Sequence, residues 1–311
     1  MIVRSMGLPM AFVDVDQALS GEWRAFEGEA DLVRVQDPPE ESWPALKKAG
    51  FLPKPQVVAW RAEALASEEE YLRSLSGKDR YDVRAAYRRA SEASLQADTE
   101  PLTERLLDEF LELYRRQVAL MSHGWAVAVE QRASILAEAA SYHAVTVRFQ
   151  GELVGACLNQ ELSVEDEVRA RFSAVTSGQR HDSLGRVLYW ETLRRARERK
   201  RRWVSLGRDI NLYGHVCKPG LFSFKSRLGF TAIPGQTLEP GSGSHQADRV
   251  VRFSELSDPT LLLTYSSVAS EKEAVAAPLH LDVFTSSAEL DVRPYRGVDL
   301  AGTTIHRTGP S

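Results

Sequence analysis

The sequence predicts an α/β protein with an α+β layout, in which helices flank a mixed, twisted sheet. Over residues 67–141 the apolar side chains recur at helical spacing, as Leu102, Leu106, Phe110 and Leu113 do. From residue 143 the spacing changes, and strand-like segments at 143–149, 153–162 and 168–177 precede a helix and a further strand. A smaller, degenerate N-terminal lobe is expected beside this sheet.

Turn and cap residues set the limits of the expected elements. Ser67 and Glu70 have the spacing of a capping box, which predicts a helix over 67–92 with a break near Gly77. The Gly-, Ser- and Pro-rich stretch 235–245 predicts a boundary. We therefore expect an N-terminal lobe over 1–66, a main domain over 67–235 and a C-terminal extension over 246–311. Further helices are expected at 101–121, 129–141, 183–201 and 221–228, and further strands at 31–35, 56–61, 203–206, 250–253 and 261–265.

The composition excludes several classes of protein. The chain has 311 residues, of which 43% are hydrophobic and 26% charged, as in ordered globular proteins. It has no apolar run of about 18 residues, so no membrane span is expected. The N-terminus lacks the pattern of a signal peptide. The two cysteines, Cys157 and Cys217, provide neither a disulfide framework nor a metal site. We expect a cytoplasmic protein with no metal and no membrane partner.

The charge is unevenly distributed along the chain. The net charge is −4, yet residues 78–227 hold 25 Lys and Arg against 20 Asp and Glu. The middle of the chain is therefore the expected site of contact with an anion. The run 194–202 holds seven basic residues and one acidic residue. It is either the solvated end of a helix, where cations complement the helix dipole, or a patch that contacts the phosphates of a tRNA.

A polar loop precedes the expected helix over 183–201. It reads Ser-Gly-Gln-Arg-His-Asp-Ser-Leu-Gly-Arg over 177–186. The free amides at the start of a helix and the positive end of its dipole can bind an anion. Gly185 allows close backbone approach, and Arg180 and Arg186 add positive charge. The alternative is a solvated loop in which Ser183 is an ordinary N-cap.

A second motif, Gly-Leu-Phe-Ser-Phe-Lys-Ser-Arg-Leu-Gly-Phe, covers 220–230. Its apolar residues Phe222, Phe224 and Leu228 are expected to pack, while Lys225 projects toward a cleft. The alternative is a lysine on the solvent face of an amphipathic helix.

Residues 67–232 resemble the GNAT acyltransferase superfamily, and in particular its FemAB-like branch. Residues 180–185 resemble the pyrophosphate loop of that superfamily, with Ser183 in place of the first glycine. Residues 221–229 are similar to the Leu-x-x-Phe-Lys-x-x-Phe-Gly run of Fem-type enzymes. Residues 76–89 resemble the basic helix that precedes the catalytic domain of that branch.

The resemblance implies a GNAT-type sheet and the transfer of an acyl group to an amine. It implies that two parallel strands, 168–177 and 203–206, splay apart and that the pantetheine arm of the donor lies in the gap. For an acyl-CoA donor, the residues that would cradle its pyrophosphate are Arg180, Ser183, Leu184, Gly185 and Arg186. In Fem-type relatives the donor is an aminoacyl-tRNA, for which the basic stretches 78–89 and 194–202 are the expected contacts. The lysine that matches theirs, Lys225, would neutralise the tetrahedral oxyanion.

Proton transfer requires an acid and a base near the reacting groups. Asp209 is expected just beyond the end of a strand, where ligands bind in α/β sheets. We assign Tyr213 as the acid and Asp209 as the base or as the anchor of the acceptor amine; the alternative is that Asp209 caps the chain or pairs with Arg208. Cys157 is expected to be a buried apolar residue, and Cys217 is not assigned a catalytic role.

The predicted function is that of an N-acyltransferase. It would move an acyl group from acyl-CoA or a related thioester to a small amine or amino acid, by direct attack in a ternary complex. One alternative is a Fem-type enzyme that forms an amide bond from aminoacyl-tRNA. The other is a GNAT-like binding module without turnover.

Overall fold

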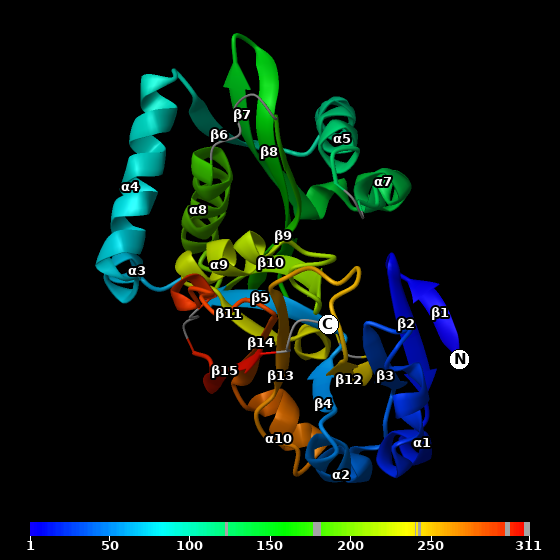
Figure 1. The fold of residues 1–311 in the computed structure, drawn as a ribbon. Helices are drawn as coiled ribbons and strands as arrows, with labels where there is room; N and C mark the ends of the chain where they lie inside the picture. Colours follow the sequence, from blue (N-terminus) through cyan, green and yellow to red (C-terminus); the bar gives the residue numbers. More distant parts are fainter. Residues whose placement is uncertain (122–123, 177–181, 240, 242–243, 296–298, 308–311) are drawn as a thin grey trace. The chain divides into compact units, whose positions relative to one another are not determined.

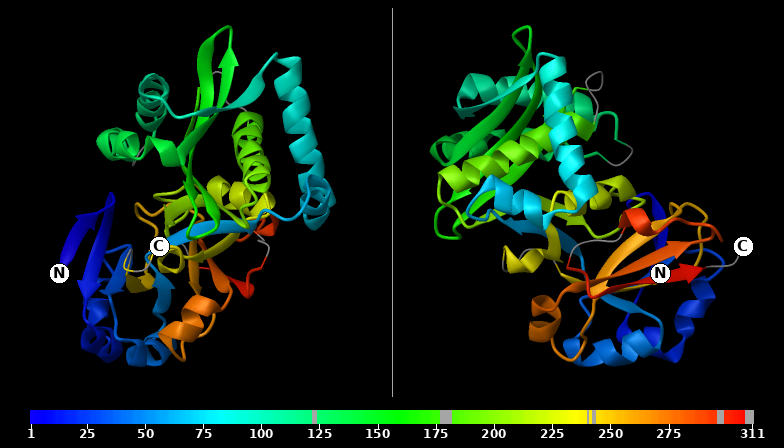
Figure 2. Two further views of the ribbon diagram at one scale, coloured as in Figure 1. Left: turned by 180° about the vertical axis from the view of Figure 1, so that it is seen from behind. Right: turned by 90° about the vertical axis from the view of Figure 1, so that its left-hand side faces the viewer.

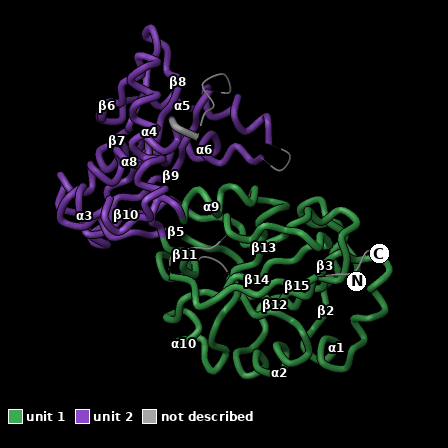
Figure 3. The backbone as a smooth tube through the Cα atoms, turned by 60° about the vertical axis from the view of Figure 1, so that its left-hand side comes forward, with its two compact units in different colours: residues 1–60, 208–226, 231–311 green, residues 61–207, 227–230 purple. Residues whose placement is uncertain are grey.

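The structure is a computed structural model that describes residues 1–311 except 122–123, 177–181, 240, 242–243, 296–298 and 308–311 (Figure 1). The chain forms two compact units (Figure 3). Unit 1 comprises residues 1–60, 208–226 and 231–311, and unit 2 comprises residues 61–207 and 227–230. The predicted mixed α/β class is confirmed, whereas the division into segments at 66 and 235 stays a prediction.

Unit 2 contains most of a seven-stranded sheet with the order β11-β5-β10-β9-β8-β7-β6. In Figures 1 and 2, α4 and α8 cover one face of this sheet, and α5 and α7 cover the other. The strands are β5 (Val57–Glu63), β6 (Gln96–Pro101), β7 (Tyr142–Phe149), β8 (Glu152–Leu162), β9 (Glu167–Val175), β10 (Trp203–Ile210) and β11 (Thr231–Pro234). The helices are α3 (Glu68–Ser74), α4 (Gly77–Glu92), α5 (Glu104–Val118), α6 (Val127–Glu130), α7 (Arg132–Ala137) and α8 (Asp182–Glu198).

Helices on both faces explain the apolar strands of this unit. The first six residues of β7 are all buried, without the alternation of a half-exposed strand. On one face, Phe110 and Leu106 of α5 pack against the sheet; on the other, Val187 of α8 packs against alanines of α4. Gly155 in β8 lets α8 approach closely, because a Cβ there would lie only 3.0 Å from Leu184 Cδ2.

Unit 1 contains a five-stranded sheet with the order β1-β2-β3-β12-β4 and a three-stranded sheet with the order β13-β14-β15. Strand β12 pairs antiparallel with both β3 and β4, so segments about 200 residues apart share one sheet. The strands are β1 (Ile2–Ser5), β2 (Leu8–Val13), β3 (Leu32–Gln36), β4 (Leu52–Pro55), β12 (His245–Val250), β13 (Thr260–Tyr265), β14 (Leu279–Thr285) and β15 (Gly302–Arg307). The helices are α1 (Val15–Ser20), α2 (Trp43–Lys48), α9 (Pro219–Arg227) and α10 (Glu271–Ala276).

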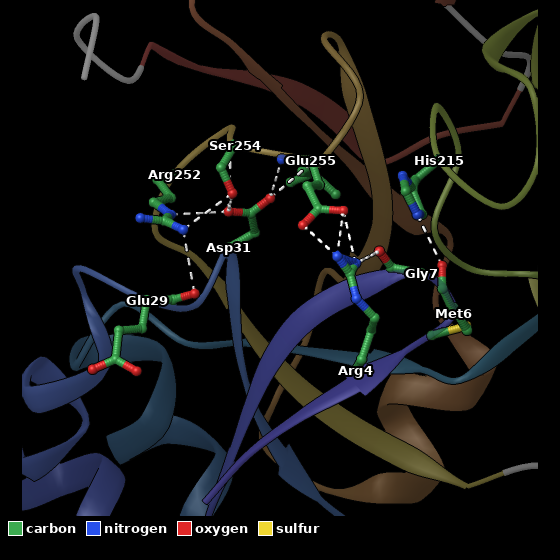
Figure 4. A network of polar contacts seen from close by, with 10 residues as sticks. Arg4, Met6, Gly7, Glu29, Asp31, His215, Arg252, Ser254 and Glu255 are labelled. Carbon is green, nitrogen blue, oxygen red and sulfur yellow. Dashed lines mark hydrogen bonds and ion pairs between the residues drawn. The ribbon is translucent and has the colours of Figure 1, made fainter.

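A buried carboxylate ties the segment after β12 to the start of β3 (Figure 4). Asp31 is fully buried and accepts hydrogen bonds from the backbone N–H of Glu255 at 2.7 Å, from that of Leu256 at 2.8 Å and from Arg252 Nε at 3.1 Å. The Ser254 hydroxyl also donates to it. Burial alone would raise the pKa of this carboxyl, but these hydrogen bonds together hold it below its usual value.

Most predicted elements are present, but the structure also contains elements that were not predicted, namely β1, β2, β4, β6, α1, α2 and α10. The predicted helix over 129–141 is two short helices and a 3₁₀ turn, and the predicted strand at 250–253 is instead β12, which ends at Val250. Strands β14 and β15 lie in the C-terminal extension, where no element was predicted after residue 265. Strand β10 continues to Ile210 beside β5, so that Asp209 lies within the strand and not beyond its end.

Candidate functional site

The three predicted catalytic side chains meet at Asp209 in unit 1. Lys225 Nζ donates to Asp209 Oδ1 at 2.9 Å and to Oδ2 at 2.8 Å. The Tyr213 hydroxyl donates to Oδ2 at 2.8 Å, and Trp60 Nε1 donates to the same oxygen at 2.9 Å. All four side chains are buried. We call Trp60, Asp209, Tyr213 and Lys225 the Asp209 cluster.

Helix α9 holds Lys225 in this cluster. The helix begins at Pro219, a residue that is well tolerated in a first helical turn. Phe222 packs edge-on against the rings of Trp60 and Tyr213, at centroid distances of 5.4 and 5.8 Å. One turn later, Lys225 Nζ lies 5.9 Å from the centroid of the Trp60 ring. Lys225 is therefore buried beside an aromatic wall and a carboxylate, and is not the solvent-facing lysine of the alternative interpretation.

The loop after β10 is held by hydrogen bonds to the backbone of β4 and β13. The buried Asn211 side chain donates to the carbonyl oxygens of Pro55 at 2.8 Å and Leu263 at 2.6 Å, and accepts from the Leu263 N–H at 2.8 Å. The backbone of Tyr213 exchanges two hydrogen bonds with Leu261 of β13, at 3.1 and 2.8 Å. The backbone of Tyr213 is thereby held by β13, while its hydroxyl is held by Asp209.

Burial and the Asp209 charge set the protonation of the neighbouring groups. Burial, followed by the negative charge of Asp209, raises the pKa of the Tyr213 phenol well above its usual value. The phenol therefore stays protonated at neutral pH and can donate a hydrogen bond. Burial and Asp209 also raise the pKa of the Cys217 thiol to about 12, against the opposing effect of Lys225. A protonated thiol is a poor nucleophile, in line with the absence of a predicted role for Cys217.

Trp60 is a member of the Asp209 cluster that the sequence does not single out. It lies in the predicted strand 56–61, where an aromatic residue is expected for packing alone. Its indole N–H donates to both Asp209 Oδ2 and the Tyr213 oxygen, each at 2.9 Å. Nothing local in the sequence distinguishes this tryptophan from a core residue. The alternative partner of Asp209, Arg208, instead pairs with Glu239 at 2.8 Å.

The predicted donor-binding residues lie in unit 2, at the start of α8. Arg180 lies outside the described residues, and so does the side chain of Ser183, although its backbone belongs to the first turn of α8. Leu184 is buried against Gly155, while Gly185 and Arg186 are partly exposed. The structure thus places a helix start at the predicted loop and leaves its anion-binding role a proposal.

Strands β9 and β10 are parallel and separate after a short contact. Their pairing covers only Trp203–Ser205 against Glu167–Arg169. Gly207 marks the divergence: its φ of +69° is left-handed, and an added Cβ would lie 3.3 Å from the Ala170 oxygen. The predicted pair of splayed parallel strands is therefore present, with β9 and β10 as its members.

The basic run 194–202 is largely paired with carboxylates of unit 2. Arg194 lies 2.7 Å from Glu191 and 3.2 Å from Glu68. The other ion pairs of the run are Arg195–Glu198, Arg197–Glu68, Arg199–Glu161 and Arg202–Glu63. These pairs offset much of the positive charge and favour the interpretation of a helix end over that of a tRNA patch.

Among the described residues, no group of three or more His, Cys, Asp or Glu side chains has the arrangement of a metal site. No helix in the described part of the chain is both long and apolar enough to span a membrane.

Two parallel strands that diverge, β9 and β10, with helix α8 between them in the chain, are an arrangement typical of the GNAT type. Residues 77–215 match the family described as the acetyltransferase (GNAT) domain, and the chain therefore contains a GNAT domain. This confirms the predicted superfamily and supports acyl transfer in general. Asp209 and Tyr213 lie inside the matched residues, whereas Lys225 lies outside them.

Several solved structures are similar to this chain at low identity. L-PGS from Bacillus licheniformis is 15% identical, with a TM-score of 0.45 over 75% of this chain and 73% of its own. FemX is 13% identical, with a TM-score of 0.44 over 77% of this chain and 80% of its own. The PaiA N-acetyltransferase from Thermoplasma acidophilum, solved with coenzyme A, is 12% identical, with a TM-score of 0.29 over 34% of this chain and 75% of its own. None of the curated proteins matches this chain.

Proposed function

We propose that this protein is an N-acyltransferase that moves an acyl group from acyl-CoA or a related thioester to a small amine or amino acid. The GNAT domain supports acyl transfer, and the observation that carries a catalytic role is the Asp209 cluster. A buried ammonium, a protonated phenol and a carboxylate lie within hydrogen-bond distance of one another. Such fixed charges and donors stabilise the charge that develops in acyl transfer.

The reaction divides among these groups as follows. The acceptor nitrogen attacks the thioester carbon, the C–N bond forms and the C–S bond breaks. Lys225 stabilises the oxyanion, and Asp209 anchors the acceptor amine or takes its proton. Tyr213 donates a proton to the departing thiolate. In the structure these groups satisfy one another, so a substrate amine must replace one of the hydrogen bonds to Asp209.

The donor is proposed to bind through residues 180–186, with its pyrophosphate on the free amides at the start of α8. Its pantetheine arm is proposed to run along β9 beyond the residues that pair with β10. An aminoacyl-tRNA donor is the second candidate, because Lys225 of the Fem-type run is buried in the cluster. The ion pairs of the run 194–202 weigh against it.

Two calorimetric titrations of the purified protein test the donor class, one with coenzyme A and one with bulk tRNA. We expect micromolar binding of coenzyme A, about −8 kcal/mol, which Gly185→Trp weakens. tRNA binding that falls steeply with salt, without coenzyme A binding, would assign the protein to the aminoacyl branch.

Turnover with acyl-CoA and a panel of amines then tests the cluster. Asp209→Ala and Lys225→Ala should each lower turnover by about a hundredfold or more while the protein still binds coenzyme A. Coenzyme A binding without product from any amine would indicate a binding module instead.

A further inference from the structure

The edge of β9 that faces away from β8 pairs with β10 only at its start, over Glu167–Arg169. On its other side, β9 pairs antiparallel with β8, and the Thr176 N–H donates to the Val154 oxygen at 2.9 Å. In an antiparallel pair the residues that bond the partner strand alternate with those that face away. Ser173 and Val175 therefore direct their backbone groups away from β8. Among the described residues, no strand pairs with this edge of β9 beyond Arg169. We call the backbone of Ser173–Val175 on this side the open edge.

The side chain of Gln117 occupies the open edge. Gln117 lies in the last turn of α5, which packs on β8 and β9. Its Oε1 accepts the Val175 N–H at 2.8 Å, and its Nε2 donates to the Ser173 oxygen at 3.5 Å. A carboxamide offers an acceptor and a donor side by side, as a peptide group does. Gln117 thus replaces the missing neighbour strand at this point of the sheet.

We propose that Gln117 holds the place of an amide of the donor's arm and must move aside when the donor binds. This inference rests on the proposed thioester donor. A pantetheine arm carries amide groups that can pair with the open edge as an added strand does. Binding it exchanges the hydrogen bonds of Gln117 for those of the donor, so Gln117 lowers the affinity for any donor with such an arm. The ester linkage of an aminoacyl-tRNA carries no N–H. It therefore cannot replace the N–H that Gln117 donates to the Ser173 oxygen.

The flexibility of glutamine suits this exchange. The Val175 N–H would otherwise be left without a protein partner when the donor is absent, at a cost comparable to a lost hydrogen bond. A rotation of the Gln117 side chain frees the edge without movement of α5. The side chain is partly exposed, so the displaced carboxamide can be hydrated.

The test compares Gln117→Ala with wild type in titrations of two probes. Coenzyme A carries the amide-bearing arm; adenosine 3′-phosphate 5′-diphosphate is the same nucleotide without it. We expect Gln117→Ala to bind coenzyme A roughly fivefold more tightly, because the competing hydrogen bonds of the Gln117 side chain, one short and one long, are lost. Its affinity for the arm-less nucleotide should not change. The matched control is Gln96→Ala, an exposed glutamine on β6, three strands from β9 in the sheet.

Hydrogen exchange of the Val175 amide provides a second measurement. It should be faster in Gln117→Ala than in wild type and should slow again when coenzyme A is added. Equal coenzyme A affinity in both proteins, or a change of equal size for both probes, would overturn the role of Gln117 and leave the thioester donor standing. Absence of coenzyme A binding in wild type and in Gln117→Ala would overturn the thioester donor and this inference with it.

Discussion

Lys225 Nζ lies 2.8 and 2.9 Å from the two carboxylate oxygens of Asp209, and both side chains are buried. Each charge has lost most of its hydration, so each depends on the other. Trp60 and Tyr213 add two further donors to the same carboxylate. Removal of either partner would therefore leave an uncompensated buried charge, and in the proposed reaction the same pair stabilises the charge that develops.

A double-mutant cycle separates these two contributions. Lys225→Met leaves the Asp209 charge buried without its cation and should lower the free energy of unfolding by about 3–5 kcal/mol. Adding Asp209→Asn removes that charge and should restore much of the loss, whereas turnover should remain abolished. Urea unfolding and acyl-transfer assays measure the two effects.

The control is Lys218→Met, which removes an exposed lysine from the segment just before α9. It should change stability by about 0.5 kcal/mol or less. If the double variant regained turnover together with stability, Lys225 and Asp209 would have a structural role only.

The reactivity of the two thiols tests the electrostatics of the Asp209 cluster. Burial raises the pKa of both thiols to about 12, and Asp209 adds to the effect at Cys217 only. Because the thiolate is the reactive form, neither cysteine should be alkylated readily at pH 8 in the folded protein. Asp209→Asn should lower the pKa of Cys217 and speed its alkylation, as peptide mass spectrometry can measure. Equal acceleration at Cys157 would show general loosening of the fold instead.

The loop that carries Tyr213 depends on a glycine. Gly214 has a φ of +104°, and a Cβ there would lie 2.2 Å from the Pro259 oxygen. Gly214→Ala should therefore lower the free energy of unfolding by about 2–4 kcal/mol and reduce turnover through displacement of Tyr213. Gly220→Ala is the matched control, because a Cβ at Gly220 would meet nothing within 4 Å. A similar loss of stability in both variants would contradict this assignment.

Local sequence patterns predicted many of the helices and strands, and together with the family resemblance they predicted the residues of the Asp209 cluster except Trp60. The Ser67–Glu70 cap forms largely as predicted: Ser67 accepts from the Glu70 N–H at 3.1 Å, although Glu70 reaches back to Ala66. Such signals lie within one turn of a helix. Trp60 and Gln117 carried no comparable signal, because their partners are 149 and 58 residues away along the chain. Their roles follow from the pairing of strands, which a single sequence does not determine.

The pH dependence of stability provides a test of Asp31. Its hydrogen bonds hold its pKa below the usual value, so it contributes stability that is fully present above about pH 4. This contribution is lost as the pH falls through the lowered pKa of the folded state. Asp31→Asn turns an acceptor-only group into one with an N–H facing backbone donors, and should cost about 2–4 kcal/mol at pH 7. The difference in free energy of unfolding between wild type and Asp31→Asn should stay constant from pH 7 to about pH 5 and shrink below about pH 4. Asp16→Asn, at an exposed position in α1, should show no such dependence beyond about 0.5 kcal/mol. A difference that is independent of pH down to pH 3 would mean that the loss comes from packing and not from the charge of Asp31.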